Sequence, residues 1–190
     1  MRQFKAFTAF LDVLGFMEIL AKPDWANRVN LIKDTLESAI MRADTRLKSH
    51  AILPKHRLNH IMISDSLILW IEWDGTPYQD IKTLRYLAHC VQQIQYECAL
   101  NDIWLRGGIS YGDVLTNEKN DNIFGMGYVS AYLLEKEADV PRVIIGTEAL
   151  EAVFVPGIDF DHVLGQSTKA AYGGLSAWEG CILESVTFLI

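Results

Sequence analysis

The sequence predicts an α+β fold: one domain, residues 1–190, with a ferredoxin-like βαββαβ core whose two long helices pack on one face of a mostly antiparallel sheet. Three observations predict it. Apolar runs of strand length alternate with long stretches of helical periodicity, and one pair of predicted strands is separated only by a tight turn. The 190 residues suit a single domain with a sizeable core, and no linker, repeat or low-complexity segment divides them.

The first strand and the first long helix follow from apolar patterning. Residues 4–13 form an apolar run with β-forming residues, interrupted by Asp12, and Gly15 lets the chain turn away. The first long helix is expected over residues 24 to about 48, where Pro23 suits its start. Its apolar stripe consists of Val29, Ile32, Leu36 and Ile40.

A hairpin and a second long helix come next. Residues 57–63 and 67–73 are predicted strands joined by the turn Ser64-Asp65-Ser66. The second helix is expected over residues 78 to 100, and Asn101-Asp102 ends it. Its apolar stripe consists of Ile81, Leu84, Leu87, Val91, Ile94 and Cys98.

Three further elements complete the predicted core. They are a strand over residues 103–115, a helix over residues 126–138 and a strand over residues 142–145. From Thr147 onward we expect a short helix and further strands, ending in the apolar segment 186–190.

The composition argues against several classes of protein. A net charge of −7, without a dense Lys/Arg cluster, argues against binding to nucleic acid. Cys90, Cys98 and Cys181 lack metal-ligand spacing and lie in apolar contexts, so we expect reduced core thiols in a cytoplasmic protein. No window approaches the roughly 18 uncharged apolar residues that span a bilayer, so we expect no direct membrane contact.

Two carboxylates stand where predicted strands end or turn. Asp12 lies near the end of the first strand, and Asp65 lies in the turn of the hairpin. If these strands are neighbours, both side chains meet at one rim of the sheet, where Mg²⁺ or Mn²⁺ would find oxygen ligands. Each residue also has a simpler interpretation, Asp12 as the N-cap of a short helix near Gly15 and Asp65 as an ordinary turn aspartate. We favour a metal site because the two motifs occur together.

Four segments extend this pattern: residues 10–16 (FLDVLGF), 63–66 (ISDS), 105–112 (LRGGISYG) and 123–135. In this order, within residues 4 to about 146, they resemble the catalytic domain of the class III nucleotidyl cyclases. Each motif alone is weak, whereas four in the expected order are fairly specific.

The resemblance implies a catalytic site built on the two aspartates. Asp12 and Asp65 would hold two divalent metal ions, Mn²⁺ or Mg²⁺, one activating the ribose 3′-hydroxyl and the other binding the triphosphate. The backbone that follows Asp12 would complete this site. Val13 is expected at the metal, and Leu14, Gly15 and Phe16 at the phosphates. The resemblance also implies a homodimer with composite sites, in which one subunit holds metal and the other contacts the base.

Of four base-reading and transition-state positions that the resemblance assigns, three depart from the pattern of the purine cyclases and Asn122 does not. Ile61 stands where a base-reading lysine or glutamate is typical, and Asn122 stands at the second base-reading position. Val129 and Leu133 stand where the transition-state asparagine and arginine are expected, and neither can do that work. The chain is therefore expected either to be inactive as a cyclase or to use another substrate and another cation.

A known group of cyclases represents the second option, an enzyme with another substrate and another cation. The motif around Asp12, the Ser-Asp-Ser turn, residues 106–108 and residues 131–135 look like the pyrimidine nucleotide cyclases of bacterial Pycsar antiphage systems. This resemblance implies cyclisation of UTP or CTP, with a messenger that activates a separate effector. The alternatives are an inactive cyclase-like module that binds a nucleotide or a partner, and a conventional purine cyclase whose base-reading residues align elsewhere.

Arg106 is the leading candidate for the missing cation, ahead of Arg57 and Lys136. It precedes Gly107-Gly108, where the backbone can come close to a ligand. Its alternative role is that of a strand-end arginine paired with an acidic neighbour. Tyr132 and Glu135 lie one helical turn apart and form either an interface pair or, as we slightly favour, core and rim positions.

Overall fold

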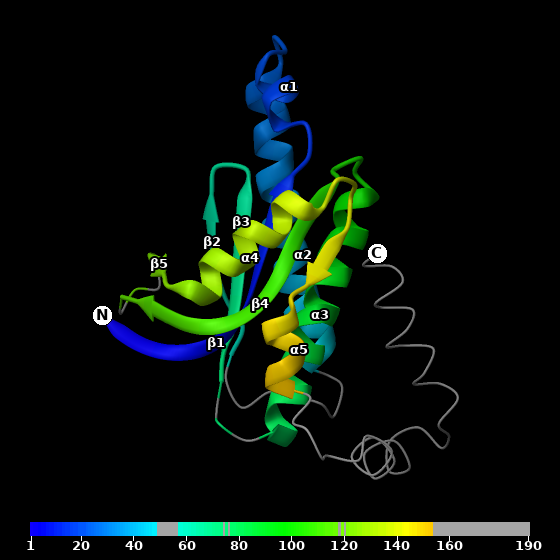
Figure 1. The fold of residues 1–190 in the computed structure, drawn as a ribbon. Coiled ribbons are helices and arrows are strands. Elements are labelled where there is room, and N and C mark those ends of the chain that lie inside the picture. Colours follow the sequence, from blue (N-terminus) through cyan, green and yellow to red (C-terminus); the bar gives the residue numbers. More distant parts are fainter. Residues whose placement is uncertain (49–56, 74, 76, 118, 120, 154–190) are drawn as a thin grey trace.

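The computed structural model describes residues 1–48, 57–73, 75, 77–117, 119 and 121–153 (Figure 1). The elements are β1 (Arg2–Val13), α1 (Phe16–Leu20), α2 (Trp25–Lys48), β2 (Asn59–Ile63), β3 (Ser66–Glu72), α3 (Pro77–Ala99), β4 (Leu105–Thr116), β5 (Ile123–Phe124), α4 (Met126–Glu137), β6 (Val143–Ile145) and α5 (Thr147–Val153). The predicted α+β class and the βαββαβ order are confirmed. The strands expected beyond α5, the segment 186–190 and Cys181 lie outside the described residues.

The strands form one sheet in the order β2-β3-β1-β4-β5, with β6 attached to β4. The β4–β6 pair is parallel and all other strand pairs of the described residues are antiparallel, so the predicted mostly antiparallel sheet is confirmed. Most boundaries lie within two residues of the prediction, and two differences bear on the site. Ser66 is the first residue of β3, so the turn consists of Ser64 and Asp65, and the short strand β5 was not expected.

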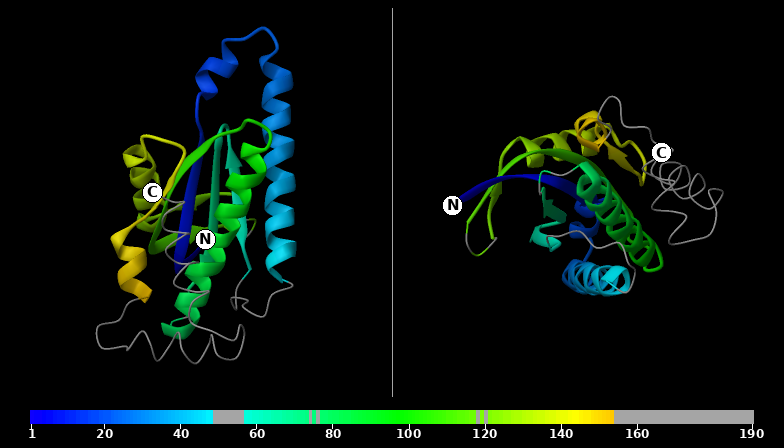
Figure 2. Two further views of the ribbon diagram at one scale, coloured as in Figure 1. Left: turned by 90° about the vertical axis from the view of Figure 1, so that its right-hand side faces the viewer. Right: turned by 90° about the horizontal axis from the view of Figure 1, so that it is seen from below.

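Helices cover both faces of the sheet, and the two long helices share one of them (Figure 2). On that face, α2, α3 and α5 pack with alternate residues of β1 in the main core, and these residues are Phe7, Ala9, Leu11 and Val13. On the opposite face, Ala6 and Phe10 pack with Ala131 of α4 in a smaller cluster. Because successive side chains of a strand point to opposite faces, burial on both sides explains the unbroken apolar run of β1.

Two glycines of β4 allow its neighbours to come close. A Cβ on Gly107 would lie 2.0 Å from the Phe10 carbonyl oxygen of β1. A Cβ on Gly108 would lie 2.4 Å from the Leu134 Cβ and 2.6 Å from the Ala131 carbonyl oxygen of α4. The Gly-Gly pair therefore serves the packing of β4 against this chain's own β1 and α4, rather than the approach to a ligand that the sequence suggested.

No helix among the described residues is long and apolar enough to cross a lipid bilayer. Cys90 and Cys98 are buried in the main core, and burial raises the pKa of the Cys98 thiol to about 12. Both positions agree with the expected core thiols.

Candidate functional site

The structure brings Asp12 and Asp65 together at one corner of the sheet. Asp12 is paired in register with Ser66 of β3 and with Arg106 of β4. The Ser66 hydroxyl donates a hydrogen bond of 3.1 Å to Asp12 Oδ1. The Asp65 backbone carbonyl accepts a 3.2 Å hydrogen bond from the Val13 N–H, which ties the hairpin turn to the end of β1. The carboxylates converge because β1 and β3 are neighbours, which meets the condition stated for the sequence.

Negative charge accumulates around Asp12. Burial, followed by the charge of Asp65 and then that of Glu135, raises the pKa of the Asp12 carboxyl. The Ser66 hydrogen bond and the Arg106 charge oppose these effects without cancelling them. A divalent cation bound here would relieve the repulsion between the carboxylates, so the donor set fits a hard cation.

Asp12 does not cap the short helix α1. The N-cap of α1 is Gly15, in a left-handed conformation with φ of +74°, and no side chain caps this helix. This removes the simpler interpretation of Asp12. For Asp65 the simpler interpretation stays open, since Asp65 does lie in a tight turn whose first residue, Ser64, has φ of +57°.

The segment that follows Asp12 wraps around the same corner. The Leu14 N–H donates a 2.9 Å hydrogen bond to the Trp104 carbonyl, so this N–H already has a partner. Gly15 is exposed, and Phe16 packs against the main core at the start of α1. N–H groups of a first helical turn have no partner within their helix. Gly15 and Phe16 therefore suit a phosphate better than Leu14 does.

Arg106 lies beside Asp12 in the same chain. Its Nη2 is 3.9 Å from Asp12 Oδ2, and its Nε is 2.5 Å from Glu135 Oε1 of α4. Glu135 is thus the acidic neighbour expected in the alternative role of Arg106. The Arg106 guanidinium also borders the candidate metal site. These two observations place Arg106 at the same corner of the chain as Asp12.

The other candidate cations are placed elsewhere. The Lys136 ammonium lies 4.5 Å from the centre of the Tyr132 ring. Tyr132 is at the rim, with its ring edge-on to Phe10 at 5.3 Å, whereas Glu135 is buried. Arg57 precedes β2, at the end of the hairpin opposite Asp65.

The two expected base-reading positions are not adjacent to each other. Ile61 is buried in the smaller cluster, opposite Ile68 in register. Asn122 is exposed just before β5, and its amide donates a 2.6 Å hydrogen bond to Asp121. Since β5 pairs with the Thr116 end of β4, ten residues from Arg106, Asn122 lies roughly 33 Å from the metal corner of its own chain. Asn122 therefore does not reach this site within one chain.

Val129 and Leu133 lie on the outer side of α4. They are 37% and 50% exposed, while Gly127, Ala131 and Glu135 form the buried stripe of the helix. The two positions that the resemblance assigned to transition-state residues therefore present apolar side chains to the outside of this chain.

Sequence reasoning missed the part that Ser66 and Glu135 play in this corner. Ser66 follows Asp65 directly, and the two-residue turn that sets its register was the available signal. Glu135 lies four residues after Ala131 on the buried stripe, but a buried glutamate inside an apolar helix pattern reveals no partner by itself.

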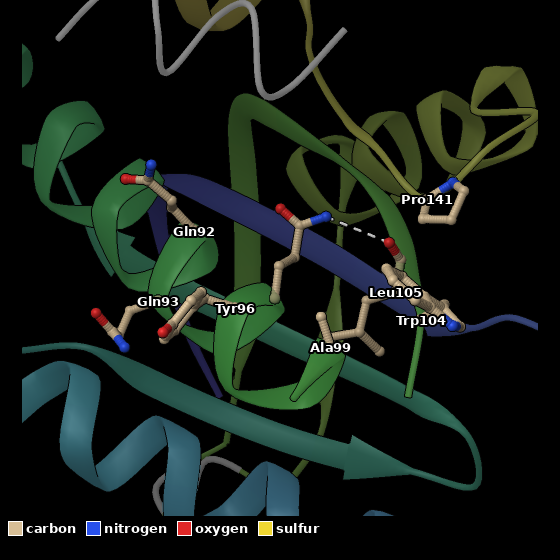
Figure 3. Close-up of a pocket in the computed structure, with 8 residues that line it drawn as sticks. Gln92, Gln93, Tyr96, Ala99, Trp104, Leu105 and Pro141 are labelled. Carbon is tan, nitrogen blue, oxygen red and sulfur yellow. Dashed lines mark hydrogen bonds between the residues drawn. The ribbon is translucent and has the colours of Figure 1, made fainter. Parts of the chain in front are cut away.

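The structure also contains a groove of about 640 Å³ between α3 and the start of β4 (Figure 3). Gln92, Gln93, Tyr96 and Trp104 line it, and Gln95 crosses to donate a 3.2 Å hydrogen bond to the Leu105 carbonyl. No charged side chain is among the residues described as its lining. A triphosphate would therefore find no counter-charge there, and the carboxylate corner is the better candidate site.

Comparison with known proteins identifies the fold. The guanylyl cyclase Cya2 superposes with a TM-score of 0.58 at 12% identity over 80% of each chain. The adenylyl cyclase CyaB from P. aeruginosa superposes with a TM-score of 0.56 at 12% identity, covering 80% of this chain and 81% of CyaB. The chain has the fold of class III nucleotidyl cyclase catalytic domains. No protein-family model and no curated protein matches the sequence.

A third similar structure is described as a class III adenylyl cyclase-like ATP-binding protein from Pseudomonas aeruginosa. It superposes with a TM-score of 0.54 at 15% identity, and the match covers 87% of this chain but 37% of that protein. The fold thus occurs both in domains named as cyclases and in one named for ATP binding.

Proposed function

We propose that this protein is a pyrimidine nucleotide cyclase that converts UTP, or CTP, into the 3′,5′-cyclic monophosphate and pyrophosphate. The observation that carries the proposal is the meeting of Asp12, Asp65 and Arg106 at one corner of a class III cyclase fold. The two carboxylates would hold the divalent cations, and Arg106 would add to the positive charge, that phosphoryl transfer from a triphosphate needs.

In the proposed reaction the 3′-oxygen forms a bond to the α-phosphorus as its proton leaves, and the bond from that phosphorus to the bridging oxygen of pyrophosphate breaks. Two divalent ions, Mn²⁺ or Mg²⁺, would activate the attacking oxygen and neutralise the leaving group when bound. Asp12 and Asp65 would hold them with help from the Val13 backbone. Ser66 orients the Asp12 carboxylate through its hydrogen bond, and Gly15 and Phe16 would contact phosphate.

Among the described residues no group of three or more His, Cys, Asp or Glu side chains could hold a metal. A divalent ion at Asp12 and Asp65 would therefore need further ligands, and for Mg²⁺ substrate phosphates and water usually supply them. Metal affinity should accordingly rise when the nucleotide is present.

The preference for a pyrimidine rests on Ile61 and on the Pycsar resemblance. Ile61 offers no hydrogen bond, and a purine reader at that position needs a polar or charged side chain. We propose UTP as the best substrate, CTP second and both purine triphosphates poor. Asn122, supplied by the second subunit of a homodimer, is the proposed base contact because its amide both donates and accepts.

The proposed biological role also follows from the Pycsar resemblance. The cyclic nucleotide would serve as a messenger in antiphage defence and activate a separate effector. The cytoplasm is the proposed location, in keeping with the buried thiols of Cys90 and Cys98.

A second function has one observation in its favour. Val129 and Leu133 are apolar and face outward, which favours a module that binds a nucleotide without cyclising it. Such a protein would bind a triphosphate with Mn²⁺ and release no pyrophosphate.

The deciding experiment incubates the purified chain with Mn²⁺ and each of the four nucleoside triphosphates, and identifies products by mass. We expect cyclic UMP above cyclic CMP. Binding without turnover supports the second function, and efficient formation of cyclic AMP or cyclic GMP overturns the pyrimidine proposal. Asn122→Ala should reduce the preference among nucleotides more than Mn²⁺ binding, and Asn30→Ala on the exposed side of α2 is the matched control.

A further inference from the structure

A buried ion pair connects α4 to the metal corner. The Glu135 side chain is 5% exposed, and its Oε1 is 2.5 Å from Arg106 Nε. The two atoms do not meet at a hydrogen-bond angle, so the contact is mainly one of charge. A buried carboxylate is costly unless it is paired, and an apolar residue at position 135 would complete the stripe formed by Gly127 and Ala131 at less cost. Simple packing of α4 therefore does not account for Glu135.

The close approach of α4 to β4 makes this pair possible. Gly108 leaves the space that Ala131 and Leu134 occupy. Glu135 lies one helical turn after Ala131, next to Arg106, which is itself two residues before Gly108 on β4. The glycine therefore sets the depth at which the Glu135 carboxylate meets the guanidinium.

The Arg106 guanidinium lies near two carboxylates, those of Glu135 and Asp12. The guanidinium is 2.5 Å from Glu135 but 3.9 Å from Asp12, its cross-strand neighbour. Arginine and a carboxylate readily form a bidentate pair, and such a pair would occupy the oxygens of Asp12 that a metal needs. Something must hold the guanidinium back, and Glu135 is the closest group of opposite charge.

We propose that Glu135 is a positioning residue, which holds Arg106 beside Asp12 rather than on it and so leaves the Asp12 carboxylate available to a divalent cation. The inference rests on the proposed function, because it deepens the account of the same metal site. Arg106 then remains close enough to meet a triphosphate bound at that cation.

A Mn²⁺ titration of the full chain, followed by the electron paramagnetic resonance signal of free Mn²⁺, tests this with a double-mutant cycle. Glu135→Gln keeps the shape of the side chain and removes its charge. It should weaken Mn²⁺ binding roughly tenfold in the wild-type background, within the range found for residues that orient metal ligands. In the Arg106→Gln background the same change should have less than about a twofold effect, because no guanidinium remains to be held.

The matched control is Glu137→Gln, the same change on the exposed side of the same helix, which should leave Mn²⁺ binding unchanged. Unaltered Mn²⁺ binding in Glu135→Gln overturns the proposal. An equal loss in both backgrounds also overturns it, since Glu135 would then act through its own charge alone. Absence of Mn²⁺ binding to the wild-type chain overturns it as well.

Circular dichroism shows whether Glu135→Gln folds. If it does not, Glu135→Asp keeps the charge but withdraws the carboxylate by one methylene, and it should weaken Mn²⁺ binding by a smaller factor that Arg106→Gln again removes. The nucleotide assay separates this result from the proposed function. A normal cycle without any turnover refutes the cyclase alone, while turnover with an additive cycle refutes the role of Glu135 alone.

Discussion

The two faces of the sheet differ in chemistry as well as in size. The face under α2, α3 and α5 is an extensive apolar core that includes Phe7, Leu11 and Leu87. The face under α4 has a smaller apolar cluster, and polar side chains lie buried beside it: Thr8, Ser110 and Glu135. β1 contributes to both, with Leu11 on the first face and Asp12 at the carboxylate corner. Of these two adjacent residues, Leu11 thus contributes to stability and Asp12 to the candidate site.

This division predicts that the two faces respond differently to substitution. Substitutions in the α2/α3 face should lower the free energy of unfolding. Metal binding and turnover should stay unchanged in the molecules that remain folded. Damage to the corner near α4 should remove metal binding and turnover at little cost in stability.

The largest expected effect is on turnover. Asp12→Asn or Asp65→Asn should each reduce cyclisation by at least about a hundredfold, since a bound metal supplies several kcal/mol of transition-state stabilisation. The metal-free variants should unfold at the same or a slightly higher urea concentration than the wild type, because repulsion at the corner is relieved. Asp34→Asn on the exposed side of α2 is the control. Full cyclase activity in either variant would contradict the two-metal proposal.

Combining variants tests whether Asp12 and Arg106 of one subunit act in the same active site of the proposed homodimer. Chains carrying Asp12→Ala mixed with chains carrying Arg106→Ala should recover no activity even where heterodimers form. The two side chains lie 3.9 Å apart in one chain, so each proposed composite site would take both from the same subunit. Recovery of activity would mean that Arg106 acts across a subunit interface.

The largest effect on stability should come from the α2/α3 face. Leu87 is fully buried there, and Leu87→Ala should lower the free energy of unfolding by about 3 kcal/mol. Urea denaturation measures this loss, and Leu31→Ala on the exposed side of α2 provides the comparison. A loss below about 1 kcal/mol for Leu87→Ala would contradict the assignment of stability to this face.

A smaller loss is expected where α4 meets β4. Gly108→Ala places a methyl group 2.4 Å from the Leu134 Cβ, so α4 must shift outward at a cost of about 1–3 kcal/mol. The shift should also weaken Mn²⁺ binding, because it moves Glu135 away from Arg106. Unchanged Mn²⁺ affinity in a destabilised Gly108→Ala protein would separate the packing of α4 from the site.

The corner should also respond to pH. Burial first, then the charges of Asp65 and Glu135, raise the pKa of Asp12, so the folded protein binds a proton there at a pH where the unfolded chain does not. Ionised Asp12 therefore costs stability near neutral pH, and this cost disappears as the pH falls through the raised pKa. The stability advantage of Asp12→Asn should shrink on acidification, while Mn²⁺ binding to the wild type is lost over the same range. An advantage that is constant with pH would contradict this.

The smallest effect is expected on the outer side of α4. Leu133 is 50% exposed, so Leu133→Arg should change the free energy of unfolding by no more than about 0.5 kcal/mol. The variant tests whether an arginine at this position raises turnover by acting on the site of a second subunit. A large loss of stability would show that Leu133 is buried in an assembly.

By itself, the sequence determined the strand and helix order, and it placed Asp12 near a strand end and Asp65 in a hairpin turn. Both follow from short-range rules, because the periods of strand and helix define the elements and turn residues mark the hairpin. The two aspartates meet only because β1 pairs with β3, which is a tertiary contact. The sequence also placed Ile61 on the hairpin strand, where its apolar side chain could not read a purine.

The tertiary structure alone decided which side chains share the corner with these aspartates. Glu135 and Arg106 are far apart in the chain. They meet because Gly107 and Gly108, which lack a Cβ, allow β1 and α4 to pack closely against β4. The same packing turned Val129 and Leu133 outward and left Asn122 at the other end of β4. Periodicity defines which residues share a helix face, but only the packing of that helix on the sheet determines which face is buried and which partners it finds.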